Sequence, residues 1–223
     1  MSSTDQPEGT GGAGEFPPPA SPAPPPPPES SYPIQYSVDY PDRPLNRLTT
    51  GLRIFTAIPI LIVVGTVSGG SYAAGGLLFF GPLLMILFRQ KYPRWWFDWN
   101  RELLRFENRV GVYFALMDDR YPSTDEQQSV RLEFECPDAA RDLNRWLPLV
   151  KWLLAIPHYV VLVFLYIGAL IAIAIAWFAI LFTGRYPRGL FDYLVGVGRW
   201  HNRVVGYAFL LVTDRYPPFR LAP

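Results

Sequence analysis

Two long runs without a charged residue constrain this chain more than any other feature. No Asp, Glu, Lys or Arg lies between Ile54 and Phe88, or between Trp152 and Gly184. A membrane-spanning helix needs about 20 apolar residues, and a soluble core helix or strand needs fewer. The sequence therefore predicts a mainly α-helical membrane protein.

An amphipathic segment follows each apolar run, at residues 93–118 and 187–213. Apolar residues recur there at steps of three and four, as on one face of an α-helix, and Pro93 and Pro187 fit a first helical turn. The two stripes correspond position by position: Trp96, Trp99, Leu103, Phe106, Val110, Tyr113 and Met117, then Leu190, Tyr193, Val197, Trp200, Val204, Tyr207 and Leu211. Aromatic residues opposite arginines are typical of a helix in the plane of the lipid headgroups. The interfacial anchors predicted on this basis are Trp95, Trp96, Trp99, Tyr193 and Trp200. A core-facing helix of a soluble domain is the alternative.

The correspondence extends along the chain and predicts a tandem duplication, with repeat A at 34–129 and repeat B at 130–223. Apolar and polar residues alternate near the start of each repeat, at 34–40 and 130–136, which predicts two short strands that could pair with each other. Leu45-Asn46-Arg47 matches Leu143-Asn144-Arg145, and each amphipathic segment is followed by Asp-Arg-Tyr-Pro. The proline-rich residues 1–33 predict a disordered tail, with a ligand for a partner domain as the alternative reading.

Each apolar run is predicted to form a helical hairpin, at 48–89 and 146–184. A single helix of 33 residues would rise about 50 Å, which exceeds a hydrocarbon core of about 30 Å. Ser68-Gly69-Gly70-Ser71 provides a turn in the first run, and Tyr166–Ala169 is the corresponding place in the second. All 20 Lys and Arg residues lie outside the two runs. The positive-inside rule then predicts a multi-pass protein with both termini in the cytoplasm.

Cations near the membrane surface are the candidate binding residues. Arg53 and Lys151 occupy matching places one or two turns into the first leg of each predicted hairpin, where they either extend to the interface or bind a lipid phosphate or an acidic partner group. Asp98, Arg105 and Arg109 share a helical line, as do Asp192, Arg199 and Arg203. Structural ion pairs and an anion or headgroup pocket are the two interpretations. The predicted lipid or partner contacts are Arg47, Arg53, Arg105, Arg109, Arg145, Lys151, Arg199 and Arg203.

Several classes of function find no support in the residues. One cysteine, Cys136, excludes an internal disulfide, and His158 and His201 alone are a poor basis for a zinc or haem site. A formal net charge of +1 gives no electrostatic case for nucleic acid. No nucleophile, histidine pair or carboxylate cluster converges, so we expect neither catalysis nor a cofactor.

The segments RYPRGLFD, RWHNRV and DRYPPF, between residues 185 and 219, resemble an uncharacterised bacterial family of integral membrane proteins. That family is catalogued as a domain of unknown function and often occurs in tandem. The resemblance extends over about residues 34–219 and implies a bacterial cytoplasmic (inner) membrane location. It implies no activity, substrate or cofactor.

These observations predict a non-enzymatic accessory or scaffold subunit that docks on the cytoplasmic leaflet. Its expected partners are membrane lipids and other membrane protein subunits. A membrane-shaping hairpin protein is one alternative. A small transporter or lipid-binding protein that uses the interface between the repeats is another.

Overall fold

The computed structural model describes residues 32–73, 75–124, 126 and 128–223, without the side chains of 67–79. Most of the predicted proline-rich tail lies outside the described residues. The described part is mostly helical and contains a short two-stranded sheet. Its elements are β1 (Gln35–Val38), α1 (Arg47–Gly51), α2 (Arg53–Ala73), α3 (Gly75–Leu84), a π-helical turn (Met85–Arg89), α4 (Arg94–Phe114), β2 (Val130–Glu133), α5 (Pro148–Leu154), α6 (Ile156–Thr183) and α7 (Arg188–Ala208).

The predicted strands form and pair with each other. They are antiparallel, and Tyr36 stands opposite Leu132 at the centre of the register. Because side chains alternate between the two faces of a strand, Tyr36, Val38 and Leu132 are buried while Ser37 and Arg131 face outward. The buried face supplies the roof of the main apolar core, which α4, α6 and α7 complete.

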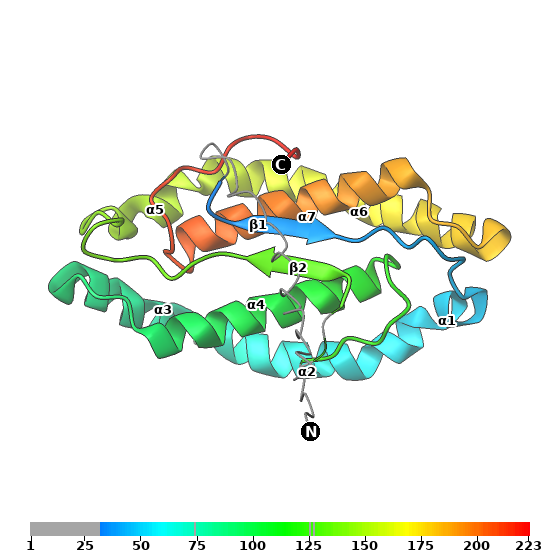
Figure 1. Ribbon diagram of the computed structural model, residues 1–223, viewed down its shortest axis with the longest axis horizontal. Coiled ribbons are helices and arrows are strands. Elements are labelled where there is room, and N and C mark those ends of the chain that lie inside the picture. Colours follow the sequence, from blue (N-terminus) through cyan, green and yellow to red (C-terminus); the bar gives the residue numbers. More distant parts are fainter. Residues whose placement is uncertain (1–31, 74, 125, 127) are drawn as a thin grey trace, which may run out of the picture. The chain divides into compact units, whose positions relative to one another are not determined.

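The strands lie over the two amphipathic helices. Strand β1 packs on α7 and strand β2 packs on α4, as Figure 1 shows. Other faces of the same helices carry the apolar helices, with α2 on α4 and α6 on α7. Each amphipathic helix therefore lies between one strand and one apolar helix.

The two amphipathic helices begin where the sequence predicts and end earlier. Pro93 and Pro187 are their N-caps, one residue before the helices start. The predicted ends at 118 and 213 are wrong, because α4 ends at Phe114 and α7 at Ala208. Leu116 and Leu211 have positive φ angles of 64° and 57°, which no right-handed helix accommodates, and they turn the chain back.

The hairpin predicted for 146–184 is wrong. Helix α6 continues for 28 residues through Tyr166–Ala169 without a turn. Gly168 does not break the helix there; it makes room for a neighbour, because a Cβ at this position would lie 2.5 Å from the Tyr193 hydroxyl. That hydroxyl donates to the Leu165 carbonyl at 2.9 Å, which anchors α7 on α6.

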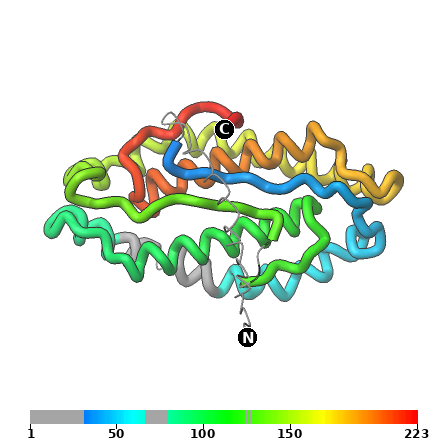
Figure 2. The backbone as a smooth tube through the Cα atoms, viewed as in Figure 1, coloured from blue at the N-terminus to red at the C-terminus, as the bar shows by residue number. Residues whose placement is uncertain are grey.

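The hairpin predicted for 48–89 is also wrong. The backbone of α2 remains helical through residues 68–71, where the turn was expected, and ends at Ala73. Figure 2 shows that the chain begins this block at one end of the fold, near α1, and leaves it at the other end, at residues 85–89. A hairpin would return the chain to the end where it began. Glycine and serine within an apolar helix weaken it without reversing it.

Candidate functional site

An extended apolar surface is the most conspicuous feature of the described residues. Helix α6 turns small residues such as Ala169, Ala172 and Ala176 towards the core and large ones outward. The exposed large apolar side chains of α2 and α6 are Ile54, Phe55, Ile58, Leu61, Ile62, Val63, Ile156, Val160, Val163, Phe164, Tyr166, Ile167, Leu170, Ile171, Ile175, Phe178 and Phe182. So many exposed large apolar side chains are unusual for a soluble monomer and indicate a membrane or protein contact.

Among the residues that the structure describes, one helix is long and apolar enough to cross a membrane. This helix is α6, Ile156–Thr183, and only 22% of its most apolar window is buried inside the protein. Helix α2 contributes a shorter apolar stretch, Arg53–Thr66. The predicted multi-pass topology is therefore not supported.

The outer face of the two strands is charged, in contrast to the exposed sides of α2 and α6. Arg131 forms an exposed ion pair with Asp39 at 3.1 Å, and Glu133 is exposed beside it. A cleft of about 870 Å³ lies between strand β2 and helix α4. Its charged lining residues are Asp39, Asp42, Arg43, Arg105, Arg109, Asp118, Arg120, Arg131 and Glu133. The described surface thus has a charged side and an apolar side.

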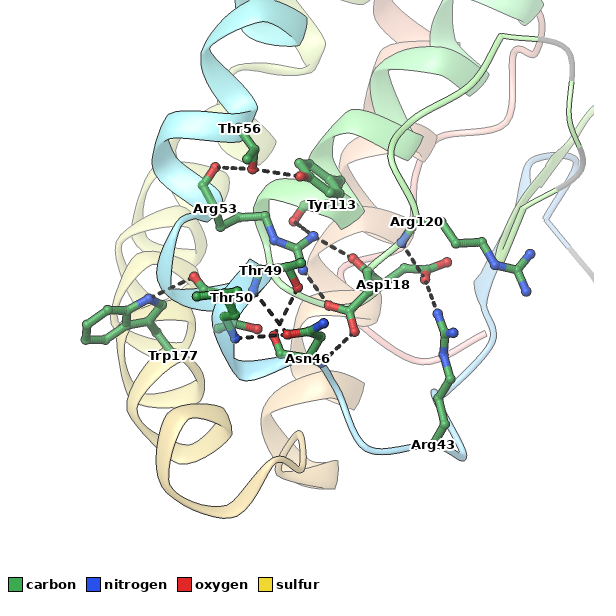
Figure 3. A network of polar contacts seen from close by, with 12 residues as sticks. Arg43, Asn46, Thr49, Thr50, Arg53, Thr56, Tyr113, Asp118, Arg120 and Trp177 are labelled. Atoms are coloured by element: carbon green, nitrogen blue, oxygen red, sulfur yellow. Dashed lines mark hydrogen bonds and ion pairs between the residues drawn. The ribbon is translucent and has the colours of Figure 1, made fainter.

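Arg53 is buried at the start of α2 and belongs to a polar network (Figure 3). Its guanidinium donates to the Asp118 carbonyl and to Asp119 Oδ1, both at 2.7 Å, and lies 4.1 Å from the centre of the Tyr113 ring. The other oxygen of Asp119 accepts from the Asn46 backbone at 2.8 Å. The Asn46 side chain in turn caps α1. This network ties the start of the apolar block to the end of α4.

Lys151 has the same arrangement in the second half. Its ammonium lies 2.6 Å from Asp214 Oδ1 and donates to the Thr213 carbonyl at 2.8 Å. The other Asp214 oxygen accepts from the backbone of Asn144. Burial lowers the pKa of Lys151, and the hydrogen bond that Lys151 donates to Asp214 opposes that shift.

The interpretation that Arg53 and Lys151 extend to the membrane interface is wrong, because their exposed fractions are 2% and 0%. A buried cation retains its charge only when it is paired, and the aspartates of the two Asp-Arg-Tyr-Pro segments provide the pairs. The sequence contained a signal for this pairing. In each half a cation precedes the apolar run and an aspartate begins the Asp-Arg-Tyr-Pro segment, so both members of the pair occur at matching places.

Four further predicted cations join the amphipathic helices to neighbouring backbone. Arg105 Nε donates to the Leu132 carbonyl at 3.0 Å, and Arg199 Nε donates to the Tyr36 carbonyl at 3.3 Å. Arg109 donates to the Ser123 carbonyl at 2.6 Å. Arg203, which is 1% exposed, donates to the carbonyls of Arg220 and Ala222, and its burial lowers its pKa to about 10. These contacts hold the helices to the strands and loops, and contact of these four residues with lipid or a partner stays a prediction.

The remaining predicted residues divide by exposure. Arg47 and Arg145 are exposed, so their contact with lipid or partner stays a prediction. Trp95 and Trp99 are exposed, and Trp96 is half-buried. Trp200 is buried and donates to His158 Nδ1 at 3.0 Å, so the prediction that it is an interfacial anchor is wrong. Tyr193 is half-buried and packs on α6, so its role as an anchor stays a prediction.

Sequence reasoning did not anticipate a reciprocal amide pair between α4 and α7. Asn108 and Asn202 each donate to the side-chain oxygen of the other at 2.8 Å. Asn202 is fully buried. The two asparagines are 94 residues apart, the same offset that relates the two amphipathic stripes, but only the packing of α4 beside α7 reveals that they meet.

A family model described as a domain of unknown function, DUF4389, matches residues 146–220. Residues 146–220 form a DUF4389 domain. The expected resemblance to an uncharacterised family is thereby confirmed over this segment. The DUF4389 domain contains α5, α6, α7 and the Asp214 segment, and it excludes both strands. The tandem duplication is not shown. No curated protein and no solved structure matches the chain.

Proposed function

We propose that the protein is a non-enzymatic accessory subunit that lies in one leaflet of a membrane. In this proposal α2 and α6 rest in the plane of the membrane with their exposed apolar sides in the acyl region. The strands face the water and provide a docking surface for a partner subunit. The observation that carries the proposal is the separation of the exposed apolar side chains of α2 and α6 from the charged strand face.

A lying orientation accommodates the charges better than a spanning one. The strands and α4 run alongside α6 (Figure 1), so a spanning α6 would carry them to the same depth. The exposed Arg131–Asp39 pair would then enter hydrocarbon, at a cost of several kcal/mol for each charge. At 28 residues α6 is also about 42 Å long, which exceeds the hydrocarbon thickness of about 30 Å. The lying orientation avoids both conflicts.

Exposed cations at the ends of the apolar helices favour an anionic leaflet, as on the cytoplasmic side. Arg185 and Arg188 follow α6, and Arg89 and Lys91 follow the first apolar block. Arg47 and Arg145 precede the two blocks. Exposed tryptophans such as Trp95 and Trp146 accompany them, and tryptophan is typical of the interfacial zone.

We also propose that the two halves are tandem repeats related by an approximate two-fold axis. Three relationships support the duplication, because each joins or repeats matched positions. Tyr36 pairs with the matched Leu132, and Asn108 bonds the matched Asn202. The Arg53–Asp119 cluster has its counterpart in Lys151–Asp214. Strand β1 of the first half packs on α7 of the second half, and strand β2 of the second half packs on α4 of the first.

The charged face is the docking surface in this proposal. Its cleft carries both signs of charge, and such a mixed surface gives specificity and register to a protein contact more than it gives affinity. Two helices inserted in one leaflet would also expand that leaflet, which favours membrane shaping as the second candidate function. Binding to vesicles of decreasing diameter tests the second function, which requires tighter binding to the smaller ones.

Nitroxide depth measurements test the orientation. Phe164, Ile171 and Phe178 are exposed on α6 at intervals of seven residues, which spreads them over about 21 Å of helix. Each would be replaced by cysteine in a Cys136→Ser background, labelled, and reconstituted in anionic vesicles. Equal immersion depths support the lying orientation. A depth that rises and falls along the helix would establish a spanning α6 instead.

A water-facing control completes that experiment. Ser37 is exposed on the outer face of β1, so a label at Ser37→Cys is expected to be accessible to a water-soluble relaxation agent and not to oxygen in the acyl region. Accessibility of all four labels to the water-soluble agent would refute the membrane contact. Mild detergent extraction followed by identification of co-purified proteins tests the accessory role, which requires a reproducible protein partner.

A further inference from the structure

A mostly apolar cavity lies between the amphipathic helices, under the strands. Its volume is about 310 Å³, within the size range of small-molecule sites. Tyr36 of β1 contributes to its roof, and α6 contributes Tyr166 and Ala169. The remaining lining residues come from α4, α7 and the turn after α4: Leu104, Glu107, Asn108, Gly111, Val112, Ala115, Met117, Leu194, Val197, Gly198 and His201.

The cavity has a polar group of residues in an otherwise apolar wall. Glu107, Asn108 and His201 provide hydrogen-bonding atoms. His201 Nδ1 and the Tyr166 hydroxyl are 2.7 Å apart and share a hydrogen bond. Desolvation lowers the pKa of His201 to about 4, so its imidazole is neutral at pH 7. The wall therefore suits a long apolar group that ends in a hydrogen-bonding head.

One edge of the cavity borders the exposed apolar side of α6. Tyr166, which lines it, is 40% exposed, and its neighbours Val163 and Ile167 belong to the exposed side of α6. On the other wall Gly111 is exposed as well. A lipid in the leaflet would meet this opening directly if α6 lies in the membrane plane.

We propose that the cavity binds one acyl chain of a membrane phospholipid. The chain lies against Leu104, Val112 and Leu194, and the polar ester region faces His201, whose imidazole can donate a hydrogen bond to an ester oxygen. This inference rests on the proposed membrane contact of α6. It adds a specific lipid site at the interface between the two halves, where the two amphipathic helices meet.

Two glycines on the lining differ in a way that makes the site testable. A Cβ at Gly198 would lie 2.8 Å from the Tyr36 ring, so this glycine serves the packing of the strand. A Cβ at Gly111 would meet no described atom within 4 Å. Gly111 lines the cavity, so Gly111→Phe is expected to obstruct it without displacing the core. Gly189, on α7 and away from the cavity, also has open space, so Gly189→Phe is a matched control.

The experiment uses a phosphatidylethanolamine whose acyl chain carries a diazirine, in vesicles with the full-length protein. After irradiation, labelled peptides are mapped by mass spectrometry. We expect labels on the cavity residues of α4 and α7 as well as on the outer side of α6. Gly111→Phe is expected to reduce the α4 and α7 labels at least tenfold and to leave the α6 labels unchanged. Gly189→Phe is expected to change neither.

The outcomes separate the lipid site from the membrane contact. Labels confined to the outer side of α6 would overturn the cavity site and retain the membrane contact. Cavity labels that persist in Gly111→Phe at the level of the control would also overturn the site. Absence of label from the whole protein would overturn both proposals. Circular dichroism and thermal unfolding of both variants show whether a loss of label reflects a loss of fold.

Discussion

Asn108 and Asn202 exchange two side-chain hydrogen bonds of 2.8 Å at the point where α4 meets α7. Each amide also donates to the backbone carbonyl four residues earlier in its own helix, which fixes its orientation. A primary amide has one acceptor oxygen and two donor hydrogens, so the pair satisfies itself almost completely. A polar contact of this kind sets the register of two helices whose other contacts are apolar.

Replacement of one asparagine is expected to cost more than replacement of both. Asn202→Leu leaves the half-buried Asn108 amide without its partner, at a cost of about 1–3 kcal/mol. Asn108→Leu with Asn202→Leu removes both polar groups and should recover part of that loss. A double-mutant cycle on unfolding free energies in detergent measures the coupling. Strictly additive losses would contradict a direct contact.

The buried ion pairs are expected to be essential to the fold. Asp214→Asn leaves the Lys151 ammonium buried without a counter-charge, and such losses cost about 3–5 kcal/mol. Asp119→Asn should act in the same way on Arg53. Thermal unfolding measures both. Arg131→Ala removes the exposed pair with Asp39 and serves as the control, with an expected loss below about 1 kcal/mol.

Gly198→Ala tests the packing of β1 on α7. Alanine favours a helix over glycine by about 1 kcal/mol, but a Cβ here would lie 2.8 Å from the Tyr36 ring. Overpacking of this kind costs about 1–3 kcal/mol, so we expect a net loss of stability. Gly189→Ala has open space in the same helix and should be neutral or stabilising. Equal effects of the two substitutions on the unfolding midpoint would argue against the close contact between the Tyr36 ring and Gly198.

His201 is expected to make stability depend on pH. Desolvation lowers its pKa from 6.5 to about 4, so the unfolded chain takes up a proton before the folded protein does. Its contribution is therefore complete above pH 6.5 and is lost as the pH falls towards 4, by roughly 3 kcal/mol in all. His201→Gln should flatten that part of the profile. Glu107 lines the same cavity and is present in both proteins, so the difference between variant and parent isolates His201.

Local pattern predicted the elements of this fold well. The periodicity of residues 93–118 and 187–213 identified α4 and α7, and alternation around Tyr36 and Leu132 identified the two strands and their pairing. The prolines located the helix starts because proline fits where no backbone donor is required. The positions of Leu116 and Leu211, which end the helices early, carry no local signal, since positive φ is rare for leucine.

Predictions from local sequence pattern failed for residues whose role depends on a contact with a residue distant in the sequence. Gly168 looked like part of a turn, but it makes room for the Tyr193 hydroxyl. Trp200 looked like an interfacial anchor, but it bonds the buried His158. Lys151 looked like a surface cation, but Asp214 holds it inside. In each case the partner lies in another element, and sequence spacing does not show which elements meet.

The sequence by itself determined that this protein is mostly helical, that two of its segments are strongly apolar, and that two amphipathic helices follow them. These properties depend on side-chain periodicity and charge along a local stretch of chain. Only the tertiary structure decided that α6 is one continuous helix, that β1 covers α7 while β2 covers α4, and that the repeated cations are buried. Those outcomes depend on desolvation and packing between residues far apart in the chain, and such energies are fixed only once the elements are assembled.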